Sequence, residues 1–95
     1  MSIYELHDDP KEVSAKPLFK TTEGNVTALQ ILENALLKEH ITKVPALLIC
    51  VAGQVLFENE NGLQKSLAAG DYIHIEPMVK HWVKGVQDSQ LLLIK

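Results

Sequence analysis

The sequence predicts an all-β fold, a sandwich or a barrel of short strands. The segment Gln54–Glu58 alternates apolar and polar side chains, which is the period of a half-buried strand. Asn61-Gly62 follows it, and this pair is typical of a tight hairpin turn because both residues tolerate a positive φ. A second turn signal, Gly70-Asp71, ends the next segment. Short strands separated by such turns are typical of all-β sandwiches and barrels.

Residues 1–20 are expected to form an N-terminal arm or an edge strand. This stretch is polar and contains Pro10 and Pro17, and a proline has no N–H to donate within a central strand. His7 stands beside two aspartates, and we interpret it as a solvated histidine and not as a metal ligand. The barrel is expected to occupy residues 25–95, so the 95 residues form a single domain.

The segment from Val26 to His40 is ambiguous when it is read alone. Apolar residues recur in it at helical spacing, and its Ala, Leu, Gln, Glu and Lys residues are good helix formers. The strand-like segments that follow favour a second interpretation, in which tertiary packing overrides local propensity. We therefore predict strands at Asn25–Leu32 and Leu36–Thr42, joined by a turn at Glu33-Asn34.

Apolar runs and turn residues define the remaining strands. Ala46–Val51 is apolar without alternation, which fits a strand covered on both faces. In Tyr72–Glu76 the two isoleucines are expected to face the barrel, so His74 is expected to face outward. The other predicted strands are Leu63–Leu67, Val79–Val83 and Gln90–Lys95. Together they make about eight strands in meander order.

Composition and charge argue against several classes of partner. The net charge is −3 with both signs mixed and no basic run, which argues against nucleic acid. No apolar run approaches the roughly 20 residues of a membrane-spanning helix, so no membrane partner is expected. The N-terminus has no apolar stretch of signal-peptide length, so we expect a soluble, cytoplasmic protein. The single cysteine, Cys50, excludes an internal disulfide and is expected to be a buried apolar residue.

The middle and C-terminal parts of the chain resemble the cupins, small double-stranded β-helix or jelly-roll barrels. His40 falls on the first histidine of the family's first motif, and Gly53 on the glycine that ends it. The second motif is matched by Gly70, by a nearby proline at Pro77 and by His81. The resemblance extends over most of the chain from about residue 25 and is closest in style to small single-domain RmlC-like cupins. It implies that the all-β fold is a jelly-roll barrel.

The chain departs from the metal-binding pattern of this family. The family's complete site holds a divalent transition metal with three histidines and one glutamate. Thr42 stands at the second histidine position and Ala46 at the glutamate position, so the motif is degenerate. Of the four ligands that the resemblance implies, His40 and His81 remain.

The resemblance thus implies a candidate metal site in which His40 and His81 bind Fe, Mn, Ni or Zn, or a barrel that holds no metal. The candidate pocket residues are Thr42, Ala46, Met78 and Val79. Two imidazoles are fewer than the three protein ligands of catalytic zinc, and non-haem iron normally needs a carboxylate as well. Glu39 is expected to point away from His40 because neighbours in a strand alternate faces. The alternative is two polar side chains in the barrel mouth, satisfied by water or by each other.

Three functions follow from these observations. The first is a small cupin enzyme that acts on a small organic molecule, with a metal as Lewis acid or oxygen activator. The second is a non-catalytic ligand-binding or sensor module, which the substitutions at Thr42 and Ala46 favour. The third is a structural dimer with a vestigial site. A homodimer is expected because the core of 95 residues is small and association pairs open strand edges.

Overall fold

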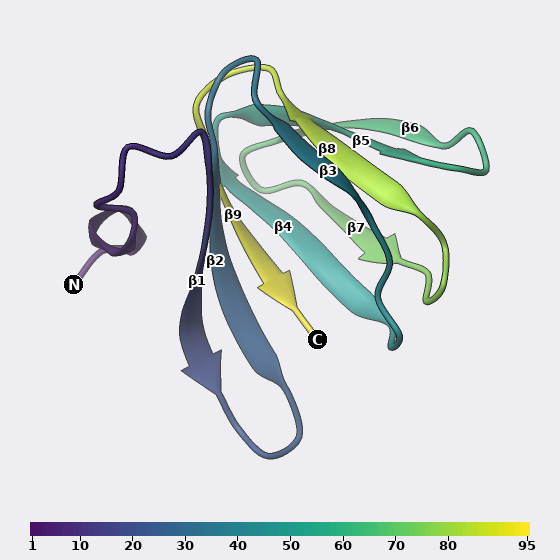
Figure 1. Ribbon diagram of the computed structural model, residues 1–95, viewed down its shortest axis with the longest axis horizontal. Coiled ribbons are helices and arrows are strands. Elements are labelled where there is room, and N and C mark those ends of the chain that lie inside the picture. The colour runs from purple at the N-terminus through teal and green to yellow at the C-terminus, as the bar shows by residue number, and fades with distance from the viewer.

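A computed structural model describes all 95 residues, as one short 3-10 helix and nine strands (Figure 1). The helix η1 spans Ile3–Leu6. The strands are β1 (Val13–Lys20), β2 (Asn25–Ile31), β3 (Leu36–His40), β4 (Ala46–Ala52), β5 (Gln54–Asn59), β6 (Gln64–Ala68), β7 (Tyr72–Ile75), β8 (His81–Gly85) and β9 (Ser89–Ile94). No helix has the length and apolar character needed to cross a membrane.

The strands form two antiparallel sheets that face each other (Figure 1). Sheet A has the order β1-β2-β9-β4-β7, and sheet B has the order β3-β8-β5-β6. The chain crosses between the sheets from β2 to β3 and again from β3 to β4, so the expected meander order is wrong. Strand β9 lies between β2 and β4. Its run of Leu91, Leu92 and Leu93 suits this central position, because a central strand can bury both faces.

The ambiguous segment forms strands, as predicted. In β2, Ala28, Leu29 and Ile31 are 1%, 4% and 0% exposed, so both faces of this strand are covered. Asn34 follows with φ of 67°, a left-handed conformation that asparagine tolerates better than most residues. The turn at Asn34 reverses the chain into β3, and packing on both faces outweighs the helical spacing.

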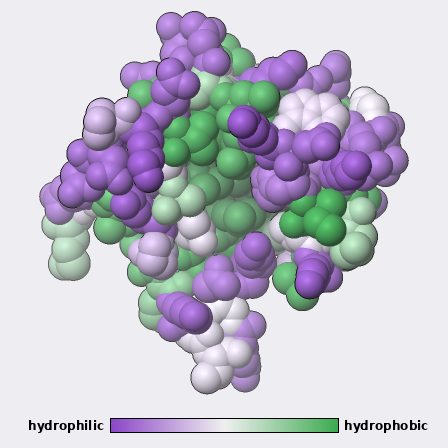
Figure 2. All heavy atoms as spheres, viewed as in Figure 1, coloured by the Kyte–Doolittle hydropathy of each residue, from purple (hydrophilic) through white to green (hydrophobic).

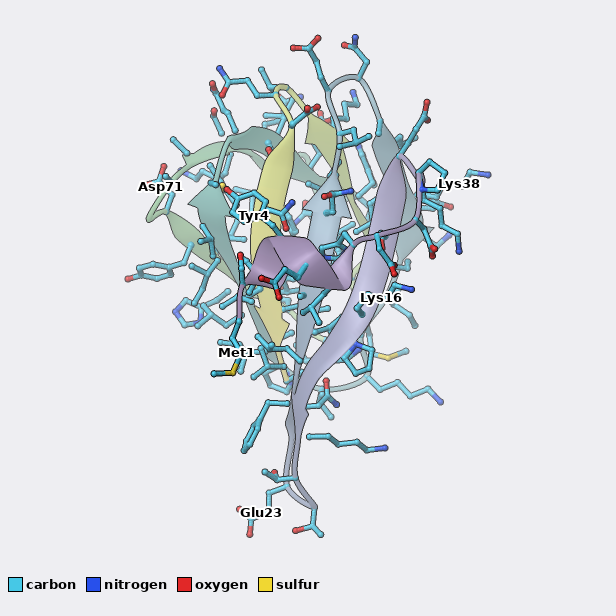
Figure 3. The ribbon with its side chains drawn as sticks, turned by 90° about the vertical axis from the view of Figure 1, so that its left-hand side faces the viewer. Met1, Tyr4, Lys16, Glu23, Lys38 and Asp71 are labelled. Carbon is cyan, nitrogen blue, oxygen red and sulfur yellow. The ribbon has the colours of Figure 1, made fainter.

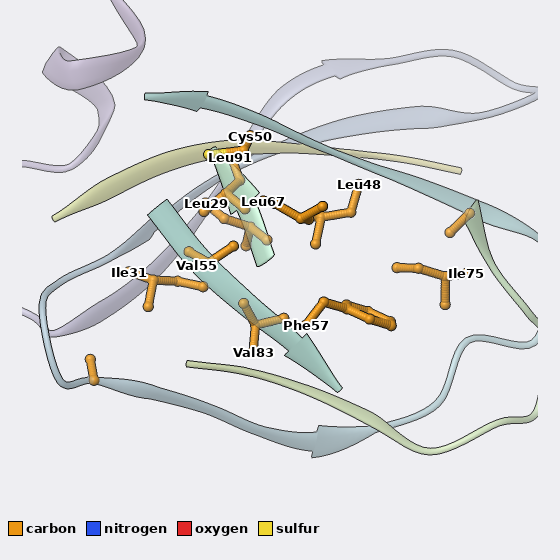
Figure 4. Close-up of a cluster of buried hydrophobic side chains, with 12 residues drawn as sticks. Leu29, Ile31, Leu48, Cys50, Val55, Phe57, Leu67, Ile75, Val83 and Leu91 are labelled. Atoms are coloured by element: carbon orange, nitrogen blue, oxygen red, sulfur yellow. The ribbon is translucent and has the colours of Figure 1, made fainter. Parts of the chain in front are cut away.

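The core lies between the two sheets (Figure 4). Its buried side chains form one cluster, to which sheet A contributes Leu29, Ile31, Leu48, Cys50, Ile75 and Leu91, and sheet B contributes Val55, Phe57, Leu67 and Val83. Val55 and Phe57 share the inner face, as their alternation predicted. Cys50 is 0% exposed, and burial raises the pKa of its thiol, with the charge of Asp71 acting in the same direction. The cysteine is therefore the buried apolar residue that was expected.

Strand β8 begins later than predicted and includes its glycine. Val79 and Lys80 belong to the loop after β7, and the strand runs from His81 to Gly85. A Cβ atom added to Gly85 would lie 2.1 Å from the carbonyl oxygen of Leu32. Gly85 therefore allows the β2–β3 turn to approach the strand closely.

The N-terminal segment folds onto the outer face of sheet A. Figure 3 shows η1 crossing in front of the strands of this sheet. His7, which was expected to be solvated, is 8% exposed, and its Nδ1 atom lies 2.8 Å from Ser14 Oγ. The expectation was wrong because the contact depends on the chain folding back onto β1. Pro17 lies in β1, an edge strand, beside a register shift between Pro17 and Phe19.

Candidate functional site

His40 and His81 lie next to each other on sheet B. They are direct partners across the β3–β8 ladder, and such partners project to the same face. Their Nε2 atoms are 3.0 Å apart, and their ring centroids are 4.2 Å apart. Phe57 stacks on His81 with ring centroids 5.5 Å apart. His81 is 2% exposed and His40 is half-buried. The two histidines that the resemblance identified are therefore in direct contact.

Backbone carbonyls orient both imidazole rings. His40 Nδ1 donates to the carbonyl of Lys38 at 2.9 Å, and His81 Nδ1 donates to the carbonyl of Val79 at 3.1 Å. Because carbonyl oxygens only accept, Nδ1 carries the proton in each ring, and a neutral ring then has its lone pair on Nε2. A hydrogen bond between the two Nε2 atoms therefore needs a third proton, which gives the pair one positive charge.

Burial opposes this charge. Desolvation lowers the pKa of His81, and the charges of His40 and Lys95 act in the same direction, while the Val79 carbonyl acts against them. Histidine has an ordinary pKa near 6.5, so a lowered value leaves the ring neutral at pH 7. Whenever neither Nε2 atom carries a proton, two lone pairs face each other, and a cation bound by both nitrogens would relieve that contact.

The barrel interior beside this pair is nearly filled. A space of about 10 Å³ remains there, lined by His40, His81, Leu29, Leu37, Leu48, Ile75, Val83 and Leu93. One water molecule needs about this much room. An organic molecule therefore does not fit inside the barrel unless core side chains move.

A larger hollow, of about 260 Å³, shares His81 with this interior space. Its apolar lining is Phe57, Leu63, Ile75 and Val79, and its polar lining is Asn59, Asn61, His74, Glu76 and His81. In the space-filling view, hydrophobic side chains lie recessed between the two sheets with hydrophilic ones around them (Figure 2). An apolar wall with a few polar groups is the usual composition of a small-molecule site, and this volume suits a small ligand.

Asn59 is a site residue that the sequence analysis missed. It ends β5 and is the direct partner of His81 across the ladder to β8. Since His81 is also the partner of His40, the three polar side chains form one row across β3, β8 and β5. Continuing the alternation of Val55 and Phe57 by one step would have reached Asn59. Its place at the start of a hairpin turn concealed that signal.

Backbone amides fix the orientation of the Asn59 side chain. Its Oδ1 atom accepts from the N–H of Asn61 at 2.9 Å and from the N–H of Leu63 at 3.2 Å. Only the oxygen of an amide can accept these two bonds, so the Nδ2 group is turned away from the hairpin backbone. The side chain thus stabilises the turn, and its Nδ2 group keeps a donor without a protein partner in a residue that lines the hollow.

Hydrogen bonds join the loops that surround the hollow. The N–H of Glu60 donates to the carbonyl of Lys80 at 2.9 Å, and the N–H of Lys80 donates to a carboxylate oxygen of Glu60. The N–H of Met78 donates to the carbonyl of Thr42 at 2.8 Å. Met78 has φ of 66°, in the left-handed region. The β5–β6 hairpin, the β7–β8 loop and the β3–β4 connection thus hold one another in place.

The other predicted site residues occupy different positions. Val79 lines the hollow. Thr42 and Ala46 are buried, and the Oγ1 atom of Thr42 has no hydrogen-bond partner. Met78 is 62% exposed. His74 is exposed, as the strand alternation predicted, and it also lines the hollow.

The residues around the histidine pair do not complete a metal site of the family's kind. No group of three or more His, Cys, Asp or Glu side chains is placed to hold a metal ion. Glu39 is exposed and adjacent to His40 in β3, so it projects to the other face. Two imidazoles are fewer than the ligand sets of catalytic zinc or non-haem iron.

Comparison with known proteins finds similarity in structure but not in sequence. No family model matches the chain, and no curated protein matches it. A cupin superfamily protein from Desulfitobacterium hafniense superposes with a TM-score of 0.85 at 12% identity, covering 98% of this chain and 84% of that one. A protein with a double-stranded β-helix domain from Klebsiella pneumoniae gives a TM-score of 0.84 at 16% identity, covering 99% and 85%.

An RmlC-like cupin from Shewanella frigidimarina gives a TM-score of 0.80 at 20% identity, covering 90% of this chain and 78% of that one. Identities this low establish the fold and not the chemistry. The motif residues Gly53 and Gly70 predicted a cupin fold. The two facing sheets, with their crossed strand order, and these superpositions confirm that prediction. The chain is a small cupin-fold domain, a double-stranded β-helix barrel.

Proposed function

We propose that this cupin barrel binds a small organic molecule in the hollow beside His81. The observation that carries the proposal is a difference in volume between the two spaces that His81 lines, the hollow and the barrel interior. The hollow offers about 260 Å³, whereas the interior beside the histidine pair offers about 10 Å³. The loops around the hollow are joined by hydrogen bonds, so binding would require little reordering of the chain.

Binding without turnover is the version that the geometry favours. Both ring nitrogens of His81 face protein atoms, because Nδ1 donates to the Val79 carbonyl at 3.1 Å and Nε2 lies 3.0 Å from His40 Nε2. A general base must reach the proton that it removes, and both nitrogens of His81 are directed at protein atoms. His81 would therefore present its ring to a ligand as part of the wall.

A substitution that fills the hollow tests this proposal. Val79→Trp places a large ring at the wall, whereas Val44→Trp adds the same ring at an exposed position outside the lining. A metabolite panel screened by thermal shift should yield a compound that raises the melting temperature of the unchanged protein and of Val44→Trp. The same compound should lose this effect with Val79→Trp. Equal stabilisation of both variants would place binding elsewhere and overturn the proposal.

Divalent cation binding by the histidine pair is a second candidate, favoured by the two facing Nε2 atoms. Titration of tag-free protein with Ni²⁺ or Zn²⁺ in a calorimeter tests it. His40→Asn should abolish the binding heat, whereas His74→Asn should not, because His74 lies outside the pair. If the heat survives in His40→Asn, the pair is not the cation site.

A further inference from the structure

We propose that the ligand of the hollow is a small ammonium compound that also carries a carbonyl-type oxygen, held between Asn59 and Glu76. This inference rests on the proposed function and specifies the ligand class. An amino acid or its amide with an apolar side chain has this chemistry.

Asn59 supplies a donor of fixed direction. Its oxygen accepts two backbone hydrogen bonds, so the side chain cannot rotate to exchange its oxygen and nitrogen without breaking both. The Nδ2 group therefore offers N–H donors, and the ligand atom that meets it must be an acceptor. A carbonyl, amide or carboxylate oxygen satisfies that requirement, whereas an ammonium group does not.

Glu76 supplies the charge of the hollow. It is exposed and lines the space, while the lining contains no lysine or arginine to neutralise it. The four ion pairs of the chain involve other carboxylates, at Glu5, Asp9 and Glu58. The lining therefore has a formal charge of −1 when its histidines are neutral, which favours a ligand with a positive group.

The apolar residues define the remainder of the ligand. Phe57, Leu63, Ile75 and Val79 provide the non-polar wall, and an aliphatic or aromatic body would bury against them. The ligand that matches this lining thus has a positive group facing Glu76, a hydrogen-bond acceptor facing Asn59 and an apolar body between them. Because the lining charge is negative, an amino acid amide, with its net positive charge, should bind more tightly than the corresponding zwitterion.

Four probes of similar size separate these contributions. Leucinamide carries all three features, leucine adds a negative charge, isoamylamine lacks the oxygen, and 4-methylpentanamide lacks the ammonium group. In calorimetric titrations leucinamide should bind most tightly, and 4-methylpentanamide should bind roughly tenfold more weakly, because its contact with Glu76 is lost. If the neutral amide binds as tightly as leucinamide, the ligand class is wrong although the site stands. If no probe binds, and no compound of the metabolite panel does, the proposed function itself fails.

Two variants assign the polar contacts. Asn59→Asp keeps an oxygen for the two backbone donors of the hairpin and replaces the ligand-facing N–H group with a second, negative oxygen. Leucinamide should then bind roughly tenfold more weakly, while isoamylamine should bind as well as before or better. Glu76→Gln should weaken both amines and leave 4-methylpentanamide unchanged.

Circular dichroism and the melting temperature of each variant establish that the hairpin remains folded. Lys65→Gln, which changes a charge in β6 outside the lining, serves as the matched surface control. Equal losses for leucinamide and isoamylamine with Asn59→Asp would overturn the assignment of Asn59 as the donor. Unchanged amine affinity with Glu76→Gln would overturn the charge argument.

Discussion

Gly53 and Gly62 have the same backbone conformation in different surroundings. Both have φ of 87°, which residues with a side chain rarely adopt. A Cβ atom added to Gly53 would lie 2.3 Å from the carbonyl oxygen of Asp88, whereas one added to Gly62 would meet no atom within 4 Å. Gly62 is therefore required for its conformation alone. Gly53 is required for conformation and for the close packing of the β4–β5 turn against the β8–β9 turn.

Alanine substitution should separate these two requirements. Gly62→Ala should lower the free energy of unfolding by about 1 kcal/mol, the cost of a left-handed residue with a side chain. Gly53→Ala should cost more than about 3 kcal/mol, because the added methyl group also displaces backbone. Urea denaturation of the two variants measures the difference. Equal losses would show that the packing at Gly53 relaxes at no cost.

Individual site residues could be predicted from the sequence only where they belong to a family motif or to the alternating pattern of a strand. His40 and His81 were identified through the family resemblance and do lie in contact. Asn59 was not identified as a site residue, because its neighbour across the ladder depends on strand register. The paired contact between His81 and Asn59 joins residues on strands that are not consecutive in the chain. Local sequence carries no information on that register.

The N-terminal segment shows how an element can depend on the rest of the fold. η1 is four residues long, too short to be stable by itself, and His7 anchors the chain that follows it. His7 contacts Ser14 in β1, and its Nε2 atom is buried without a partner. Burial lowers the pKa of His7, and the charge of Lys16 lowers it further. Protonation of His7 is therefore opposed in the folded state.

Acidification should loosen this segment. The folded pKa of His7 lies below the unfolded value near 6.5, so the unfolded chain binds the proton more readily. The stability that neutral His7 contributes is therefore present above the unfolded pKa near 6.5. It decreases as the pH falls from there toward the lower, folded pKa. His7→Asn preserves a partner for Ser14 but does not titrate, so its melting temperature should fall less between pH 7 and pH 5 than that of the unchanged protein. Parallel curves for the two proteins would exclude His7 as the titrating group.

At the scale of elements, boundaries and order were less predictable than the existence of strands. The strand at Asn25–Leu32 and the strand at Tyr72–Glu76 were located to within a residue or so. The start of β8 was misplaced because Val79 is apolar yet lies in the loop, lining the hollow. The strand order was wrong because the position of β9 between β2 and β4 depends on long-range pairing.

At the scale of the whole molecule, the outer face of sheet A carries apolar side chains that lie outside the core between the sheets. On the outer face of sheet A, cross-strand neighbours in β2, β9 and β4 form two rows. One row is Val26, Ile94 and Leu47, and the other is Leu92 and Ile49. All five are half-buried, whereas Ala28, the β2 neighbour of Leu92, is already covered. Tyr72, the neighbour of Ile49 in β7, is 62% exposed. We propose that a second copy of the chain packs against this face, which would enlarge the buried area of a small domain.

A charge placed on this face tests the dimer. Ile49→Lys on the outer face of sheet A should convert a dimer into a monomer, because an unpaired charge would be buried at the contact. Leu56→Lys makes the same change on sheet B, at a half-buried position opposite Lys84, and should leave the assembly intact. Sedimentation velocity measures both. A monomeric unchanged protein at high concentration would contradict the proposal.

The buried thiol of Cys50 in β4 can report when the two sheets of the barrel separate. Cys50 is the single cysteine of the chain and is 0% exposed among core residues contributed by both sheets. A thiol reagent can reach its sulfur only when the sheets separate or β4 detaches, so the labelling rate measures the population of open molecules. A compound that binds the hollow should slow this labelling in proportion to its occupancy. The chain thus carries an internal readout of ligand binding that needs no chromophore, no tag and no known activity.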